Sequence, residues 1–529
     1  ESDNKIIASW CSNEKTAMES ALGMSFAGKR SLVTMKHVGL NVAADPFING
    51  ALLGIKGGLV IMVADDPGMH SSQGEQDSRY YAAFASPPLG IPCFEPRNQE
   101  EAYNMAREAF DVSEYFKMPV LFRLTTRLSH ARSQVTTRKA ISQKPLDKAA
   151  DRSEWMLLPA MARKNYAGKL AKADALERWA SEHPVNRLKI SGNTQEDSAV
   201  IDKSFAVISG GLGGNYYEEN LDDLKAKLEG KIPARLHIGV YPLPKDLILS
   251  LAKDAKTILV IEEGQPYIEE KIKGILPTGI VVRGKLDGSL PRTGELDADV
   301  VRPALDLAAR KSILATSGAN SLNDLLCKVP GRPPQLCQGC PHADSYNTIK
   351  QVRDEILAEA AAKNVPEEKR KDLIALCSDI GCYSLGASPP FQVPETIVCM
   401  GASIGMAHGA ADAGVPYSIG IIGDSTFLHS GITGLVDAVA GNTPMTIIIL
   451  DNSIVAMTGC QETIIPSSAL KPLILGAGLY PAHYVELEAK KQLQDENAKK
   501  LRTELEYRGL SVIVFKRECL EAFRKRNKK

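Results

Sequence analysis

The sequence predicts an α/β protein built on parallel sheets. Short runs of β-branched and aliphatic residues alternate with segments of helical periodicity along most of the chain. Glycine and small polar residues follow several of these runs, at the strand ends where parallel sheets place ligands. The 529 residues suffice for roughly three to four domains of about 150 residues each.

The composition excludes several classes of protein. With 44% hydrophobic and 24% charged residues, the chain is neither mainly disordered nor fibrous. Lys and Arg number 63, as do Asp and Glu, so no basic excess argues for nucleic acid as a partner. No apolar run is long enough to cross a bilayer and no signal region begins the chain, which predicts a cytoplasmic protein without a membrane partner.

The first expected domain spans residues 1–135. Three runs, Ser31–Met35, Gly58–Asp65 and Pro119–Thr125, are typical of buried strands, and Glu100–Phe116 has the periodicity of a helix. Residues 136–200 are rich in charged residues and Ala, which predicts a linker with helices such as Pro159–Trp179.

A second α/β domain is expected over residues 201–312. A strand at Phe205–Ser209 leads into a turn with four glycines, 210–214. Such a turn can hold a dinucleotide, but glycines there also let a helix pack closely, and we favour close packing. The acidic pair Glu262–Glu263 is expected in a solvated loop at a strand end.

A Pro-rich linker at 313–335 precedes the third domain, 336–529. Its long charged helix, Leu487–Tyr507, is expected to face solvent. Its expected strands are Asp372–Leu376, Tyr417–Ile422, Met445–Leu450 and Leu510–Phe515.

Two strand ends in this third domain carry residues suited to a magnesium diphosphate. Gly423, Asp424 and Ser425 end one strand, and Asn452 follows the next. Glycine lets a diphosphate approach the backbone, and the oxygens of Asp424 and Asn452 are ligands that Mg²⁺ prefers. The helix expected to start after Gly431 would present N–H groups to an anion.

The pattern resembles the thiamin diphosphate (ThDP) motif, Gly-Asp-Gly or Gly-Asp-Ser followed by Asn a little under thirty residues later. The resemblance implies Asp424, Asn452 and the backbone carbonyl of Ile454 as Mg²⁺ ligands. Further segments match the large (α) subunits of the indolepyruvate:ferredoxin oxidoreductases, in the 2-oxoacid:ferredoxin oxidoreductase superfamily. These segments are Met35–Asn41, Ala64–Gln73, Cys399–Gly409 and Ala456–Gln461.

The resemblance implies a ThDP-binding fold: two ThDP-type parallel-sheet domains with a transketolase C-terminal-like α/β domain between them. It makes 1–135 the pyrimidine-binding domain and 336–529 the pyrophosphate-binding domain. The chain starts with Glu and stops about ten residues after Cys519, so we expect it to lack an N-terminal segment and a C-terminal ferredoxin-like domain.

ThDP requires a carboxylate that holds N1′ of its aminopyrimidine ring, in a dry site that raises the carboxylate pKa. The family places this residue at the start of a helix, and the matching residue is Glu14. The simpler interpretation, in which Glu14 favours the helix N-terminus next to a cap at Ser12 or Asn13, is compatible with it.

Two of the ten cysteines, Cys337 and Cys340, form a C-x₂-C pair. The spacing suits a metal, a cluster or redox chemistry, and zinc would need further ligands. The resemblance adds Cys382 and Cys519, and so implies a [4Fe–4S] cluster close to ThDP. Met457 and Cys460 follow the Mg²⁺ loop and are expected near the cofactor. The remaining cysteines are expected to be small buried hydrophobes: Cys11, Cys93, Cys327, Cys377 and Cys399.

Several polar side chains are candidates for binding or proton transfer. His37, His70 and His429 lie near or within the matched segments, although a lone histidine is more often structural. Arg123 and Arg127 could clamp a substrate carboxylate, with ion pairing as the alternative.

The expected function is therefore oxidative decarboxylation of aryl 2-oxo acids such as indolepyruvate and phenylpyruvate. The resemblance implies coenzyme A as co-substrate, a smaller β subunit as partner, and ferredoxin or a similar carrier as electron acceptor. Three alternatives stay open: another 2-oxo acid range, a non-oxidative ThDP decarboxylase or synthase, and a scaffold subunit without turnover.

Overall fold

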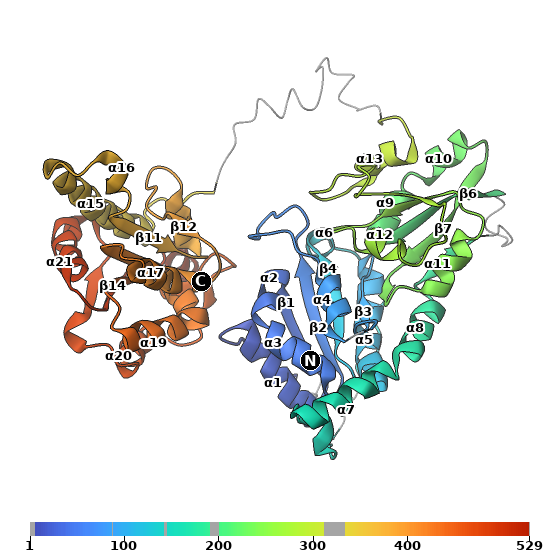
Figure 1. The fold of residues 1–529 in the computed structure, drawn as a ribbon, viewed down its shortest axis with the longest axis horizontal. Helices are drawn as coiled ribbons and strands as arrows, with labels where there is room; N and C mark the ends of the chain where they lie inside the picture. Colours follow the sequence, from blue (N-terminus) through green and yellow to red (C-terminus); the bar gives the residue numbers. More distant parts are fainter. Residues whose placement is uncertain (1–5, 87, 142–144, 191–199, 311–333, 528–529) are drawn as a thin grey trace. The chain divides into compact units, whose positions relative to one another are not determined.

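A computed structural model describes residues 6–86, 88–141, 145–190, 200–310 and 334–527 (Figure 1). The chain divides into two compact units. The first contains Asn13–Leu326, and the second contains Cys327–Lys529 together with Trp10–Ser12. Most of the linker predicted at 313–335 lies outside the described residues, as does Cys327.

The first unit begins with a mainly parallel sheet. In spatial order its strands are β1 (Ser31–Lys36), β2 (Leu59–Asp65), β4 (Val120–Thr125), β3 (Cys93–Phe94) and β8 (Val240–Tyr241). Only β8 runs antiparallel to its neighbour. The helices around this sheet are α1 (Glu14–Phe26), α2 (His37–Val42), α3 (Ala44–Leu52), α4 (Ser78–Ala85), α5 (Gln99–Phe116) and α6 (Thr126–His130). The three predicted strands are thus confirmed within one residue at each end.

The stretch predicted as a helical linker contains α7 (Pro159–Leu170) and α8 (Ala173–Glu182), where the sequence suggested one continuous segment. The Lys169 ammonium at the end of α7 donates to the carbonyl oxygens of Leu53 and Lys117, each at 2.7 Å. These two carbonyls belong to the C-terminal caps of α3 and α5. Because a cation stabilises a helix C-terminus, this contact fastens α7 to the first sheet's helices.

A second sheet in the same unit has the order β10 (Val281–Arg283), β9 (Thr257–Ile261), β6 (Val200–Gly210), β7 (Lys231–Ile238) and β5 (Arg187–Lys189). Its helices are α9 (Gly213–Glu218), α10 (Leu221–Lys227), α11 (Lys245–Ala252), α12 (Tyr267–Ile272) and α13 (Ala298–Val301). A Cβ on Gly213 would lie 2.2 Å from the Ile261 carbonyl oxygen. The glycine-rich turn therefore serves close packing of α9 on β9, as the sequence favoured.

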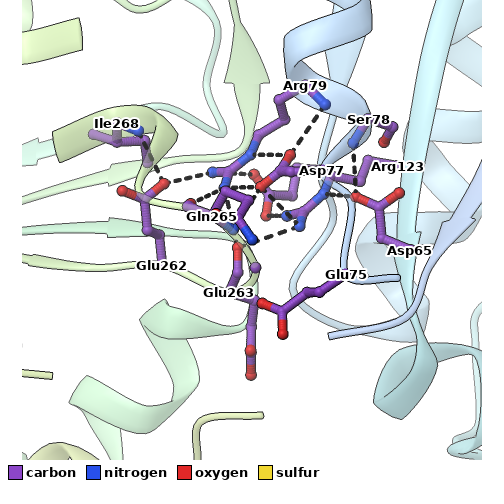
Figure 2. A network of polar contacts seen from close by, with 12 residues as sticks. Asp65, Glu75, Asp77, Ser78, Arg79, Arg123, Glu262, Glu263, Gln265 and Ile268 are labelled. Carbon is purple, nitrogen blue, oxygen red and sulfur yellow. Dashed lines mark hydrogen bonds and ion pairs between the residues drawn. The ribbon is translucent and has the colours of Figure 1, made fainter. Parts of the chain in front are cut away.

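Two buried arginines connect these two parts of the first unit (Figure 2). Arg123 on β4 donates to Asp65 at 2.6 Å and to Asp77 at 3.3 Å, and also pairs with Glu95. Arg79 on α4 binds Asp77 through two nitrogens. Burial would raise the pKa of Asp77, but the two guanidinium ions outweigh it and lower that pKa to about 2.

This network corrects two expectations. Arg123 is fully buried among carboxylates, so it is not an open clamp for a substrate. Glu262 and Glu263 are also buried rather than solvated. Glu262 lies 2.8 Å from Arg79 and accepts the backbone N–H groups of Ile268 and Glu269. Ion pairs and hydrogen bonds from distant parts of the sequence thus offset the desolvation cost of these charges.

The second unit is built on an all-parallel sheet with the order β12 (Thr396–Ile397), β11 (Ile374–Ser378), β13 (Tyr417–Gly423), β14 (Met445–Asp451), β18 (Ser511–Lys516) and β17 (Tyr484–Glu488). A short hairpin joins β15 (Ile454–Val455) and β16 (Gln461–Glu462). Its helices include α15 (Pro341–Ala362), α16 (Glu367–Arg370), α17 (Ala402–Asp412), α18 (Asp424–Thr426), α19 (Ile432–Gly441), α20 (Leu470–Gly476), α21 (Gln494–Glu506) and α22 (Leu520–Asn527).

The helix predicted over Leu487–Tyr507 is wrong at its start. Residues 484–488 form the edge strand β17, and the helix begins only at Gln494. Tyr484 and Leu487 are buried while the charged residues between and after them are exposed, which is the pattern of an edge strand. Among the described helices, none is long and apolar enough to span a bilayer.

Replacing Arg123 by Met should destabilise the first unit strongly. Three carboxylates, Asp65, Asp77 and Glu95, would lose a buried cation, which costs about 3–5 kcal/mol of unfolding free energy. Urea denaturation followed by circular dichroism measures this loss, with the exposed Arg152→Met variant as a control that unfolds like wild type. Unchanged stability with impaired substrate binding would instead restore the clamp hypothesis.

Candidate functional site

A cavity of ≈ 110 Å³ lies at the carboxyl ends of β13 and β14 in the second unit. Two neighbouring parallel strands end here, so the polar residues that follow each strand face one space. Seven of the predicted site residues line the cavity: Cys382, Gly423, Asp424, Ser425, Asn452, Ile454 and Met457. His342, Ile380, Tyr383 and Thr426 are among the other residues that line it.

The Asp424 carboxyl group dominates the electrostatics of this cavity. Burial, and then the neighbouring carboxylate of Asp451, hold the pKa of Asp424 well above its usual range. One oxygen, Oδ1, accepts the Ser425 N–H at 2.8 Å, whereas the buried Oδ2 has no hydrogen-bond partner. Neither Asp424 nor Asp451 forms an ion pair within the described part of the chain. A cation bound here would satisfy the unpartnered Asp424 oxygen and offset its repulsion with Asp451, so the donor set fits Mg²⁺.

The backbone around Asp424 is held by close packing. A Cβ on Gly423 would lie 2.5 Å from Cε1 of the Tyr383 ring, so only glycine fits beside that ring. Helical structure begins directly at Asp424 and continues through Phe427–Gly431 into α19. As expected, α19 begins at Ile432, directly after Gly431, but it continues a longer helical stretch. The free N–H groups at its start belong to the Asp424 region instead.

Asn452 is held in the cavity by three hydrogen bonds. Its Oδ1 accepts the Ile454 N–H at 3.1 Å, and its Nδ2 lies 3.1 Å from His342 Nε2. Its backbone oxygen accepts the Cys519 N–H at 3.2 Å. Burial lowers the pKa of His342 to about 4, so its ring is neutral near pH 7 and Nε2 accepts a hydrogen bond.

Four cysteines expected to hold a cluster lie in one neighbourhood. Burial, and then the neighbouring thiols of Cys340, Cys519 and Cys337, raise the pKa of Cys382 to about 12. Cys460 acts on Cys382 in the same direction, so a fifth thiol is also near. Within the described ranges, no three His, Cys, Asp or Glu side chains are grouped closely enough to hold a single metal ion.

Of the cysteines expected to be buried, Cys93 and Cys377 are, and Cys11 is partly exposed. Cys399 is exposed, so that expectation is wrong. It lies two residues after the end of the edge strand β12, next to the exposed Ile397 and Val398.

Glu14 lies in the first unit, at the first position of α1. Asn13 caps this helix by accepting the Thr16 N–H at 2.9 Å, as one of the two expected caps. A Cβ on Gly39 would lie 2.5 Å from Glu14 Oε1, so the carboxylate occupies the space beside the side-chain-free face of α2. Glu14, His37 and Arg127 belong to the first unit, and the remaining site residues belong to the second.

The other polar candidates have clear surroundings. His37 is buried, with Nε2 2.9 Å from the Gly74 carbonyl oxygen and Nδ1 3.3 Å from that of Ala64. Arg127 is exposed and donates to Glu295 at 3.3 Å, and His70 lies 3.4 Å from the same carboxylate. His429 contacts Ser430. These contacts hold the side chains in place within the fold. The roles of His37, His429 and Arg127 in catalysis stay predictions.

Sequence reasoning missed three residues of the cavity region: His342, Asp379 and Tyr383. Asp379 is buried and accepts the hydroxyl groups of Tyr383 and Ser403. Burial raises the pKa of Asp379 to about 6, against the effect of these hydrogen bonds. Their positions beside Cys340 and Cys382 were the available signal, because residues next to ligands often hold them in place.

The all-parallel sheet and its strand-end cavity fit a thiamin diphosphate-binding domain. Residues 379–514 match the family described as "Thiamine pyrophosphate enzyme, C-terminal TPP binding domain". The chain belongs to the family of indolepyruvate oxidoreductase IorA subunits. This membership confirms the predicted α/β ThDP-binding fold and the resemblance found in the sequence.

Two relatives illustrate the similarity. The IorA subunit of Archaeoglobus fulgidus is 34% identical over 96% of this chain and 78% of that subunit. The IorA subunit of Methanothermobacter marburgensis is 36% identical over 85% of this chain and 68% of that subunit. Among solved structures, a 2-oxoglutarate:ferredoxin oxidoreductase from Magnetococcus marinus aligns with a TM-score of 0.39 at 14% identity, over 52% of this chain and 53% of that one.

Replacing Asp424 by Asn should stabilise the ligand-free chain. The change removes a buried carboxyl group that has an unpartnered oxygen and faces Asp451, which we expect to raise the unfolding free energy by about 1–3 kcal/mol. Chemical denaturation in the absence of Mg²⁺ and ThDP measures the gain, and Asp412→Asn, at an exposed position, should change it little. A loss of stability in Asp424→Asn would show that the carboxyl group is compensated.

Proposed function

We propose that this chain is the ThDP-carrying large subunit of an oxidoreductase that decarboxylates aryl 2-oxo acids. The acyl group is transferred to coenzyme A, and the electrons leave through a [4Fe–4S] cluster to ferredoxin or a similar carrier. The observation that carries the proposal is the buried, unsatisfied Asp424 carboxyl group at a strand-end cavity, next to four grouped cysteines. The name of the relatives, indolepyruvate oxidoreductase, supports the aryl substrate.

The second unit would hold the diphosphate end of the cofactor. Asp424, Asn452 and the Ile454 carbonyl would bind Mg²⁺, while Gly423 and Ser425 would lie against the diphosphate. Met457 and Cys460 would contact the part of ThDP that reacts. Residues 336–529 are thus assigned as the pyrophosphate-binding domain, in agreement with the match to residues 379–514.

The first unit would supply the activating carboxylate. We assign 1–135 as the pyrimidine-binding domain and 201–312 as the transketolase C-terminal-like domain. ThDP, when bound, supplies the carbanion chemistry at the 2-keto carbon of the substrate. Glu14 would hold N1′ of the aminopyrimidine and favour the tautomer whose nitrogen removes a proton. His37, His429 and Arg127 stay candidates for substrate contacts.

The cluster assignment rests on Cys337, Cys340, Cys382 and Cys519. A four-iron cluster binds each thiolate to a different iron, so its ligands are spread more widely than those around one ion. The four cysteines are near enough to affect one another electrostatically, yet no three of them lie close enough to bind one ion. This spacing is compatible with such a cluster. Such a cluster also supports the oxidative reaction over a non-oxidative ThDP decarboxylase, which would need no cluster.

The test is an anaerobic assay of the purified enzyme, together with its smaller subunit, using a panel of 2-oxo acids, coenzyme A and a viologen dye. We expect dye reduction with indolepyruvate and phenylpyruvate. Glu14→Gln should lower kcat at least about a hundredfold, because general acid–base assistance contributes roughly 10²–10⁴-fold. Glu19→Gln, at an exposed position on the same helix, is the matched control and should retain activity.

Activity with pyruvate or branched-chain substrates but not with aryl ones would contradict the aryl assignment. An iron content near four per chain is expected. Decarboxylation without iron and without dye reduction would favour the non-oxidative alternative, and a chain that binds no ThDP would favour the scaffold.

A further inference from the structure

Three chain segments meet at Asn452 in the second unit. One carries Cys337 and Cys340 and enters α15 through His342, one follows β14, and one follows β18 and ends at Cys519. The His342 ring bonds the Asn452 side chain at 3.1 Å, and the Cys519 N–H bonds the Asn452 carbonyl oxygen at 3.2 Å. Asn452, proposed to bind Mg²⁺, therefore contacts two chain segments that carry proposed cluster ligands, one at His342 and one at Cys519.

The hydrogen bonds fix the orientation of the Asn452 amide. The Ile454 N–H can only donate, so the amide atom facing it is Oδ1. The atom facing His342 Nε2 is then the Nδ2 donor. His342 and Asn452 are both nearly fully buried, so water does not replace this bond if it breaks.

Arg517 strengthens the same junction. Its backbone N–H donates to the Asp451 carbonyl oxygen at 3.1 Å. Its guanidinium donates at 2.6 Å to the carbonyl oxygen of Gly339, which lies between the two cysteines of the C-x₂-C pair. It also pairs with Asp344 on α15. Ordering any one of the three segments thus restrains the other two.

From these contacts we propose that binding of Mg²⁺–ThDP and binding of the cluster are thermodynamically coupled through Asn452, with His342 as the positioning residue that carries the coupling. The inference rests on the proposed function, because it requires both cofactors. Cluster ligation by Cys340 and Cys519 fixes the two groups that hold Asn452, so its oxygen is oriented before Mg²⁺ arrives. By linkage, each cofactor strengthens binding of the other by the same factor.

The experiment measures ThDP affinity by calorimetry at saturating Mg²⁺ on the complete chain under anaerobic conditions. It compares chain with a loaded cluster and chain stripped of iron by a chelator. We expect affinity about tenfold higher in the loaded chain, within the usual range of coupling between sites. As a second readout, saturating Mg²⁺–ThDP should slow the loss of iron to a ferrous chelator.

The affinity ratio is the ThDP affinity of the loaded chain divided by that of the stripped chain. His342→Ala should bring this ratio close to one while both cofactors still bind. His342→Gln, whose amide oxygen can accept the same hydrogen bond, should keep a higher ratio than His342→Ala. The matched control is His408→Ala, at a histidine that bonds Thr443 instead, and it should keep the wild-type ratio.

Equal ThDP affinity of loaded and stripped wild-type chain overturns the coupling and leaves the proposed function intact. A wild-type ratio that persists in His342→Ala overturns the role of His342. A chain that holds no iron, or no ThDP, overturns the proposed function and the coupling with it. If His342→Ala does not fold by circular dichroism, the wild-type ratio and His342→Gln decide.

Discussion

The parallel register of β13, β14 and β18 is the constraint on which the second unit depends. Gly423 is aligned with Leu450, and Asp451 is aligned with Lys516, so all three strands end along one edge. The residues that follow them, around Asp424, Asn452 and Cys519, are brought together by sheet geometry alone. The residues proposed to bind the diphosphate and those proposed to bind the cluster are far apart in the sequence but thereby become neighbours at this edge of the sheet.

Among the described residues, buried carboxylates are paired with arginines in the first unit, whereas those at the cavity of the second unit are not. In the first unit, every member of the group Asp65, Asp77 and Glu95 contacts an arginine, and the charges hold two sheets together. In the second unit, Asp424 and Asp451 face each other without an arginine or lysine paired to either in the part that the structure describes. Networks that are satisfied within the chain stabilise it, whereas a site left unsatisfied is poised for a ligand and reduces stability until the ligand binds.

The sequence predicted the strands and the cavity well because both are encoded locally. Buried parallel strands are continuous apolar runs, and Asp424 and Asn452 stand directly after two of them. The burial of Arg123, Glu262 and Glu263 could not be predicted in this way. Their partners come from distant segments, and a charged residue considered alone is expected to face solvent. The edge strand at 484–488 was hidden by its charged exposed residues, which resemble a helix surface. Only the position of His342 beside Cys340 pointed to it in the sequence, since its partner Asn452 is 110 residues away.

If the ends of β13, β14 and β18 hold both cofactors, a crystal structure of the anaerobically prepared chain with Mg²⁺ and ThDP will show them side by side. Diffraction data collected at the iron absorption edge would locate the iron atoms independently of the protein. The account predicts iron bonded to Cys337, Cys340, Cys382 and Cys519, and the ThDP diphosphate against Gly423–Ser425 with Mg²⁺ on Asp424 and Asn452. Iron on other residues, or a diphosphate bound away from the ends of β13 and β14, would contradict it.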